Sequence, residues 1–110
     1  MLKIAMSAAA ANLLRVLIAR AGVPRDRILL TDVQSTDWQS LTLTGERHQI
    51  DLRISPPHSE AVARRMCFGL EDAEFSIPEL IVADIAVLEG PARERDGSTR
   101  VTIEALTIEE

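Results

Sequence analysis

Residues 39–54 decide the fold, and they read QSLTLTGERHQIDLRI. The stretch holds two alternating runs, whose apolar members are Leu41 and Leu43 at odd positions and Ile50, Leu52 and Ile54 at even positions. Side chains of a strand alternate between the two faces of a sheet, so a two-residue turn at Gly45 and Glu46 brings both runs into one phase. The stretch therefore predicts a β-hairpin with one apolar and one polar face.

The register of this predicted hairpin assigns individual side chains to a face. It pairs Leu43 with His48 on the apolar face, which turns the imidazole towards the core. It pairs Trp38 with Arg53 on the polar face, where the guanidinium stacks on the indole. Tryptophan and arginine are also enriched at protein interfaces, so this pair is either a local support of the hairpin or part of a docking surface.

Two helices are expected on either side of the hairpin. Ser7 caps the first, over residues 8–21, where apolar residues recur at 3-4 spacing until a Gly-Val-Pro sequence ends the pattern. The second is expected over residues 55–70, with a Ser-Pro-Pro start. Its core stripe consists of Val62, Ala63, Met66, Cys67 and Leu70. Phe68 falls on the outward side of this helix, where a partner could dock.

Three further strands complete the predicted fold. Residues 27–33 are rich in branched side chains, residues 80–89 form a nearly continuous apolar run that favours a central strand, and residues 99–109 return after an Asp-Gly turn. The whole chain, residues 1–110, is expected to form a single α+β domain. Two helices pack on one face of a mostly antiparallel sheet, in the order α-β-β-β-α-β-β.

Composition argues against several classes of function. The 17 acidic and 12 basic residues give a net charge of -5, and only three aromatic side chains are present, so nucleic acid is not an expected partner. No stretch of about 20 apolar residues could span a bilayer, so we expect no membrane association. A single cysteine, Cys67, forms no internal disulfide, which favours the cytoplasm. Arginine far outnumbers lysine, a bias associated with bacterial genomes of high GC content.

Motifs for cofactor chemistry are missing from the sequence. The five glycines are isolated from one another, so no phosphate-binding loop is formed and no cofactor is expected. His48 and His58 lie on different predicted elements, so no metal site is expected from them. Asp84 interrupts an apolar strand and must find a partner or lie at an opening. With an Asp-Gly turn it pairs with Glu109, an arrangement that could hold a hard cation.

These observations support three hypotheses of function. The first is a non-catalytic binding or assembly module, acting as a homo-oligomer through Trp38, Arg53 and Phe68. The second is a small-molecule enzyme or ligand-binding domain that uses a pocket with His48 and Asp84, although the sequence identifies no ligand. The third and weakest is a cation site at Asp84 and its predicted partner.

Overall fold

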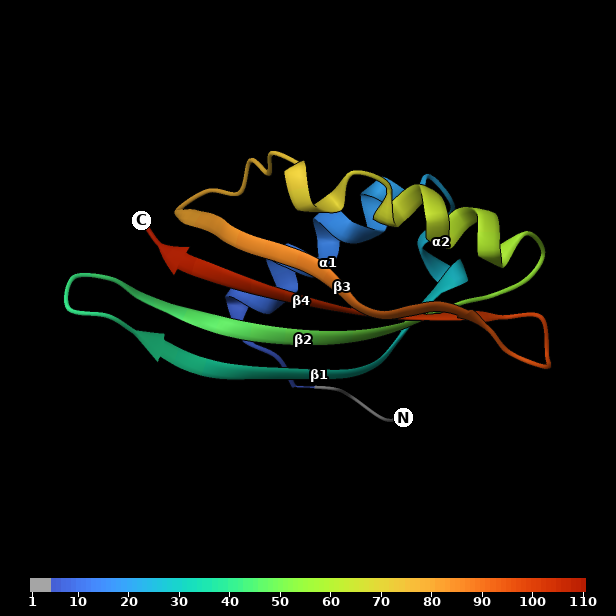
Figure 1. Cartoon of the computed structure of the whole chain (residues 1–110), viewed down its shortest axis with the longest axis horizontal. Helices are drawn as coiled ribbons and strands as arrows, with labels where there is room; N and C mark the ends of the chain where they lie inside the picture. Colours follow the sequence, from blue (N-terminus) through green and yellow to red (C-terminus); the bar gives the residue numbers. More distant parts are fainter. Residues whose placement is uncertain (1–4) are drawn as a thin grey trace.

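The computed structural model describes residues 5–110 and contains two helices and a four-stranded sheet (Figure 1). The elements follow the order α1 (Ala8–Ala21), β1 (Ile28–Gln39), β2 (Thr44–Ile54), α2 (Ser59–Cys67), β3 (Leu80–Arg93) and β4 (Thr99–Glu109), with short 3-10 turns at Arg25–Arg27 and Leu70–Asp72. This confirms the predicted α+β class with one strand fewer than expected. None of the described helices is long and apolar enough to cross a membrane.

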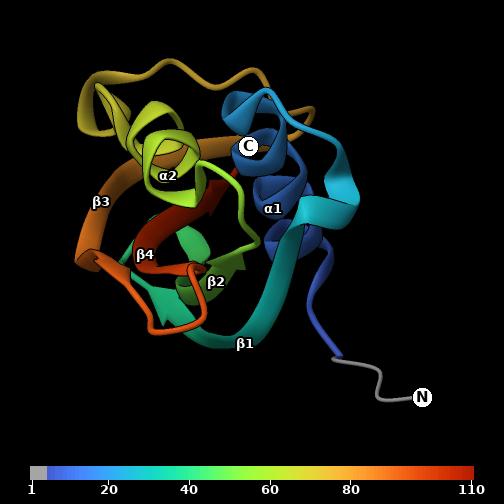
Figure 2. The same ribbon diagram turned by 90° about the vertical axis from the view of Figure 1, so that its right-hand side faces the viewer.

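Helix α1 forms where the sequence predicted it. The Ser7 hydroxyl accepts a hydrogen bond from the Ala10 N-H at 3.1 Å, and Gly22 ends the helix in the left-handed conformation at φ 69°. Arg20 then ties α1 to α2, because its Nε donates to the Met66 carbonyl at 3.0 Å. The two helices lie together on one side of the sheet, which curls around them (Figure 2).

The sheet is antiparallel throughout, with strand order β1-β2-β4-β3. The side chains that fill the space between sheet and helices include Leu13, Leu17, Ile50, Leu52, Ile54, Met66, Leu70 and Ile103. In β2 the even-numbered residues face the helices, as the alternation predicted. The odd-numbered residues of β2 therefore point to the opposite side, which no element of residues 5–110 covers (Figure 2).

The predicted turn at Gly45-Glu46 is wrong. Strand β1 continues to Gln39, and the chain turns at residues 40–43, where the Ser40 N-H donates to the Leu43 carbonyl at 2.9 Å. Gly45 lies inside β2, and a Cβ at this position would sit 2.0 Å from the Thr107 carbonyl oxygen on β4. The glycine therefore serves a close strand approach and not a turn. Leu41, expected in the core, is fully exposed.

The start of the second helix also differs from the prediction. His58 has a positive φ of 59°, so the helix begins at Ser59 and not at the Ser-Pro-Pro sequence. The buried Ser59 hydroxyl donates to the Gly97 carbonyl at 2.6 Å and lies 2.8 Å from the Thr99 hydroxyl. These contacts fix the helix to the β3-β4 hairpin. The predicted core stripe is otherwise confirmed, and Phe68 is 83% exposed.

Strand β3 lies at the edge of the sheet, and the expectation of a central strand for residues 80–89 is wrong. The central strand is β4, which pairs with β2 on one side and β3 on the other. β4 is buried on both faces, since Ala105 faces the helices and Ile108 is buried on the opposite side. Irregularities in β3 shift its register, so Asp84 lies opposite Leu106 and not opposite Glu109.

Candidate functional site

His48 is buried between the sheet and the helices, and both of its ring nitrogens have hydroxyl partners. Nδ1 lies 2.7 Å from the Ser35 hydroxyl on β1, and Nε2 lies 2.8 Å from the Thr107 hydroxyl on β4. The Thr107 hydroxyl donates to the Glu46 carbonyl at 3.4 Å. Thr107 therefore accepts from the Nε2-H, which assigns the proton to Nε2 and leaves Nδ1 as the acceptor from Ser35.

The environment of His48 keeps the ring neutral. Burial lowers the pKa of His48 from its usual 6.5, and the nearby Glu46 carboxylate opposes this effect. A neutral ring with a free lone pair on Nδ1 is able to take a proton from the Ser35 hydroxyl. The inward orientation of His48 agrees with the sequence, although its partner across the hairpin is Ser35 and not Leu43.

An open groove of about 520 Å³ lies beside Ser35. Its walls come from residues 33–35 of β1, from Glu46 on β2 and from residues 5–7, which lead into α1. Asp84 is absent from these walls, because its register opposite Leu106 places it on the other face of the sheet, where it is exposed. The structure thus does not bring His48 and Asp84 together.

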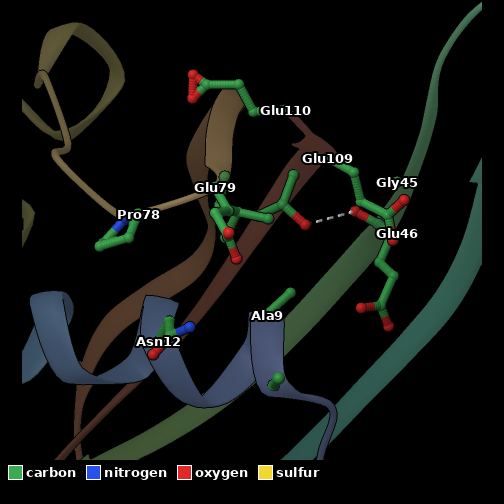
Figure 3. A pocket seen from close by; sticks show the side chains of 11 residues that line it. Ala9, Asn12, Gly45, Glu46, Pro78, Glu79, Glu109 and Glu110 are labelled. Atoms are coloured by element: carbon green, nitrogen blue, oxygen red, sulfur yellow. Dashed lines mark hydrogen bonds between the residues drawn. The ribbon is translucent and has the colours of Figure 1, made fainter.

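A second groove, of about 510 Å³, separates the start of α1 from the ends of β2, β3 and β4 (Figure 3). Glu46, Glu79, Glu109 and Glu110 line it. Figure 3 shows the Glu46 and Glu110 side chains pointing away from each other, so the carboxylates do not converge. Among the described residues no group of three or more His, Cys, Asp or Glu side chains is arranged to hold a metal ion. Glu109 pairs with Leu80, which separates it from Asp84.

Cys67 and His58 are two further side chains with reactive groups, and neither is arranged for chemistry. Cys67 is half-buried at the end of α2, and burial raises the pKa of its thiol, with Arg20 opposing this effect. A protonated thiol is a poor nucleophile. His58 precedes α2 and is exposed, without a hydrogen bond from its side chain to the helix.

The helix-free face of the sheet consists of the outward side chains of all four strands, arranged in cross-strand rows. Like charges are direct neighbours in two of these rows: Arg53 pairs with Arg100, and Asp32 pairs with Asp51. The Thr102 hydroxyl donates to Asp51 at 2.7 Å. Direct cross-strand neighbours of the same charge are unfavourable, so the face carries two local repulsions.

Trp38 and Arg53 both lie on the helix-free face, as predicted, but they do not pair with each other. Trp38 is the partner of Gly45 near one end of β2, and Arg53 is the partner of Leu29 near the other end. The predicted intramolecular stacking is therefore wrong, because it depended on the misplaced turn. Phe68 lies beyond α2 in the helical layer, so the three predicted interface residues do not form one patch.

Sequence reasoning missed Ser35 and Thr107, the partners of His48. They stand 13 and 59 residues away from it, and no local motif links the three positions. Only the correct hairpin register and strand order would have brought them together. Comparisons of the chain with models of protein families, with curated proteins and with solved structures gave no match. The geometry itself is therefore the basis for any proposal of function.

Proposed function

We propose that this protein is a non-catalytic assembly module that forms a homodimer through its helix-free face. The observation that carries the proposal is the distribution of charge on that face. The Arg53-Arg100 and Asp32-Asp51 neighbours repel each other within one chain, in two adjacent rows of the face. A partner surface that brings opposite charge to either pair would relieve the repulsion within that pair.

A second copy of the chain is the occupant that best fits this surface. It carries both signs of charge on this face, with Arg47, Arg53 and Arg100 beside a larger number of acidic residues. A strongly acidic or strongly basic partner would relieve one row and aggravate the other. The net charge of -5 opposes association at long range, but salt screens such repulsion beyond about 10 Å. Short-range complementarity on the face therefore decides whether two copies associate.

The strand dimensions give an upper limit for the contact area of the helix-free face. Four strands at about 4.8 Å spacing and ten residues at about 3.4 Å per residue would cover about 650 Å² if the sheet were flat. The sheet curls around the helices, so its outer face is convex and the contact is centred on the middle strands (Figure 2). A standard interface buries about 800 Å² per partner. Apolar contacts are available as well, because Leu29 is 57% exposed and Ile81 is 48% exposed on this face, and Trp38 is only half-buried.

Light scattering after size exclusion tests the dimer directly. We expect twice the chain mass of 12.1 kDa at micromolar concentration. Gln49→Glu adds a charge of the same sign beside Glu104 at the centre of the face and should give monomers. Gln39→Glu makes the same change near the hairpin tip, outside the face, and should leave the dimer intact. A mass equal to one chain for the unaltered protein would overturn the proposal.

The contact between Ser35 and His48 favours a second candidate function, a small-molecule enzyme or ligand-binding site in the groove beside Ser35. A hydroxyl 2.7 Å from the lone pair of a neutral imidazole is the geometry of an activated nucleophile, and Thr107 orients the ring. The chemistry would be acyl transfer to the Ser35 oxygen. Asp84 has no part in it, because it lies on the opposite face.

A serine-directed fluorophosphonate probe tests this second candidate. Covalent labelling located at Ser35 by mass spectrometry, and lost in both Ser35→Ala and His48→Gln, would support catalysis. Thr31→Ala provides a control, because Thr31 is an exposed hydroxyl residue of the same strand without a histidine partner. Labelling that is absent, or equal in the Ser35→Ala variant, would leave the Ser35-His48 contact as a structural hydrogen bond.

A further inference from the structure

We propose that the two-fold axis of the homodimer crosses the centre of β2 at Gln49, so that Arg47 of each copy pairs with Asp51 of the other. This inference rests on the proposed dimer and specifies its register. It starts from the outward residues along strand β2, which are in order Gly45, Arg47, Gln49, Asp51 and Arg53. Arg47 and Asp51 have opposite charges and stand at equal distances from Gln49.

A face-to-face dimer has its two-fold axis in the plane of the interface. If the axis runs across the strands, each strand packs over its own copy in the reverse direction. The outward residue two positions before Gln49 then meets the residue two positions after it, which brings Arg47 to Asp51 twice. The two Gln49 side chains meet at the axis, where each amide can both donate and accept a hydrogen bond.

The alternative axis, along the strands, is unfavourable. It packs β2 of one copy over β4 of the other without reversing the order of the rows. Arg53 would then lie over Arg100 of the second copy, in addition to its like-charged neighbour within its own chain. Four arginines would meet at one end of the interface. The charge pattern of this chain therefore selects the axis across the strands.

The same register brings Arg53 to Trp38 between copies. Arg53 and Gly45 stand at equal distances from Gln49, so the Arg53 guanidinium reaches Gly45 of the second copy, whose cross-strand partner is Trp38. Guanidinium over indole is a favourable contact, and it is stronger where water is excluded. Leu29 lies at the matching position on β1 and reaches Trp38 of the second copy as well.

Two kinds of like-charge contact oppose this register. On β3, Glu89 and Asp84 stand on opposite sides of the axis, so Glu89 of each copy meets Asp84 of the other. The other contact lies at the axis and provides a test of the register. Glu104 is the β4 neighbour of Gln49, so the two copies of Glu104 approach each other near the axis. Glu104→Gln removes this repulsion, and we expect it to strengthen the dimer by about threefold or more, since modest like-charge contacts are worth less than about 1 kcal/mol. A dimer that forms through another part of the surface should show no such gain.

A charge exchange on β2 completes the experiment. Arg47→Glu places two acidic groups together, and Asp51→Arg places two arginines together, each of them twice per dimer. We expect either variant to weaken dimerisation by about tenfold or more, measured by sedimentation or by light scattering across a dilution series. The double variant restores opposite charges in both contacts and should return to within about threefold of the unaltered dimer.

The outcomes separate the register from the dimer itself. A monomeric unaltered protein would overturn the proposed function and the register with it. If Gln49→Glu disrupts the dimer, the register alone would be overturned by a double variant that is no tighter than Asp51→Arg, or by a Glu104→Gln variant that is weaker than the unaltered dimer. Asp51→Arg also loses the bond from Thr102, so thermal melts of Asp51→Arg and the double variant establish that both fold.

Discussion

His48 gives the protein a specific dependence of stability on pH. Burial lowers the pKa of His48 from 6.5 in the folded state, so the unfolded chain binds this proton more tightly than the folded chain does. The contribution of His48 to the free energy of unfolding is therefore constant above about pH 6.5. Below that pH the contribution becomes destabilising, as the pH falls towards the lowered pKa of the folded state. Urea unfolding at pH 5.5 and 7.5 measures the effect.

The matched variant for this prediction is His48→Gln, which has no titrating ring. We expect the free energy of unfolding to fall further between pH 7.5 and 5.5 in the unaltered protein than in His48→Gln. Because other groups titrate equally in the two proteins, the difference between them isolates His48. An equal fall in both would mean that the pKa of His48 is not lowered by folding.

Gly45 is required by the approach of β2 to β4. A Cβ there would meet backbone atoms of Thr107, which are fixed by the ladder and cannot yield as a flexible side chain can. We expect Gly45→Ala to lower the free energy of unfolding by about 3 kcal/mol, near the upper end for overpacking. Gly69→Ala is the control, since its Cβ meets nothing within 4 Å and only the positive φ opposes it, at about 1 to 2 kcal/mol. An equal loss in both variants would contradict the crowding at Gly45.

At the scale of the elements, the sequence predicted helix α1 and the inward face of β2 but not the register of the first hairpin. Alternation specifies which residues share a face, whereas register depends on where the chain turns. Gly45 carried a turn signal because glycine suits both turns and close strand contacts. The predicted strand of residues 27–33 is shorter than β1, because the polar residues 34–37 indicate the end of a strand. An edge strand with one exposed face accepts such polar residues.

Leu41 offers a direct test of the corrected hairpin. It lies in the turn and is fully exposed, so Leu41→Asp should change the free energy of unfolding by less than about 0.5 kcal/mol. In the register that the sequence favoured, Leu41 would pair with Ile50 in the core, and the same substitution would be severely destabilising. Ile50→Ala is the reference for a buried site and should lose about 2 to 5 kcal/mol. A loss of that size for Leu41→Asp would contradict the observed turn.

At the scale of the whole molecule, strand order lay beyond sequence patterning. The apolar run of residues 80–89 is typical of a central strand, yet β3 lies at the edge of the sheet. Its bulges and Pro91 interrupt the side of the strand that pairs with no other strand. The contacts of the candidate site could not be predicted for the same reason, because they depend on strand order and register. His48 could be assigned to a face from alternation alone, but its contact with Thr107 depends on β4 lying next to β2, and the separation of His48 from Asp84 depends on the β3 register.

Trp38 reports on the assembly of two whole molecules, because it is the only tryptophan in the chain. In the proposed dimer, Arg53 and Leu29 of the second copy cover its ring, so dissociation should expose the indole to water. We expect its fluorescence emission to move to longer wavelength, and quenching by acrylamide to increase, as the protein is diluted through the dimer-monomer transition. The Arg47→Glu variant should show the exposed spectrum at concentrations where the unaltered protein is still dimeric. If the mass from light scattering halves while the Trp38 emission stays constant, Trp38 lies outside the interface, and two copies meet through another part of the surface.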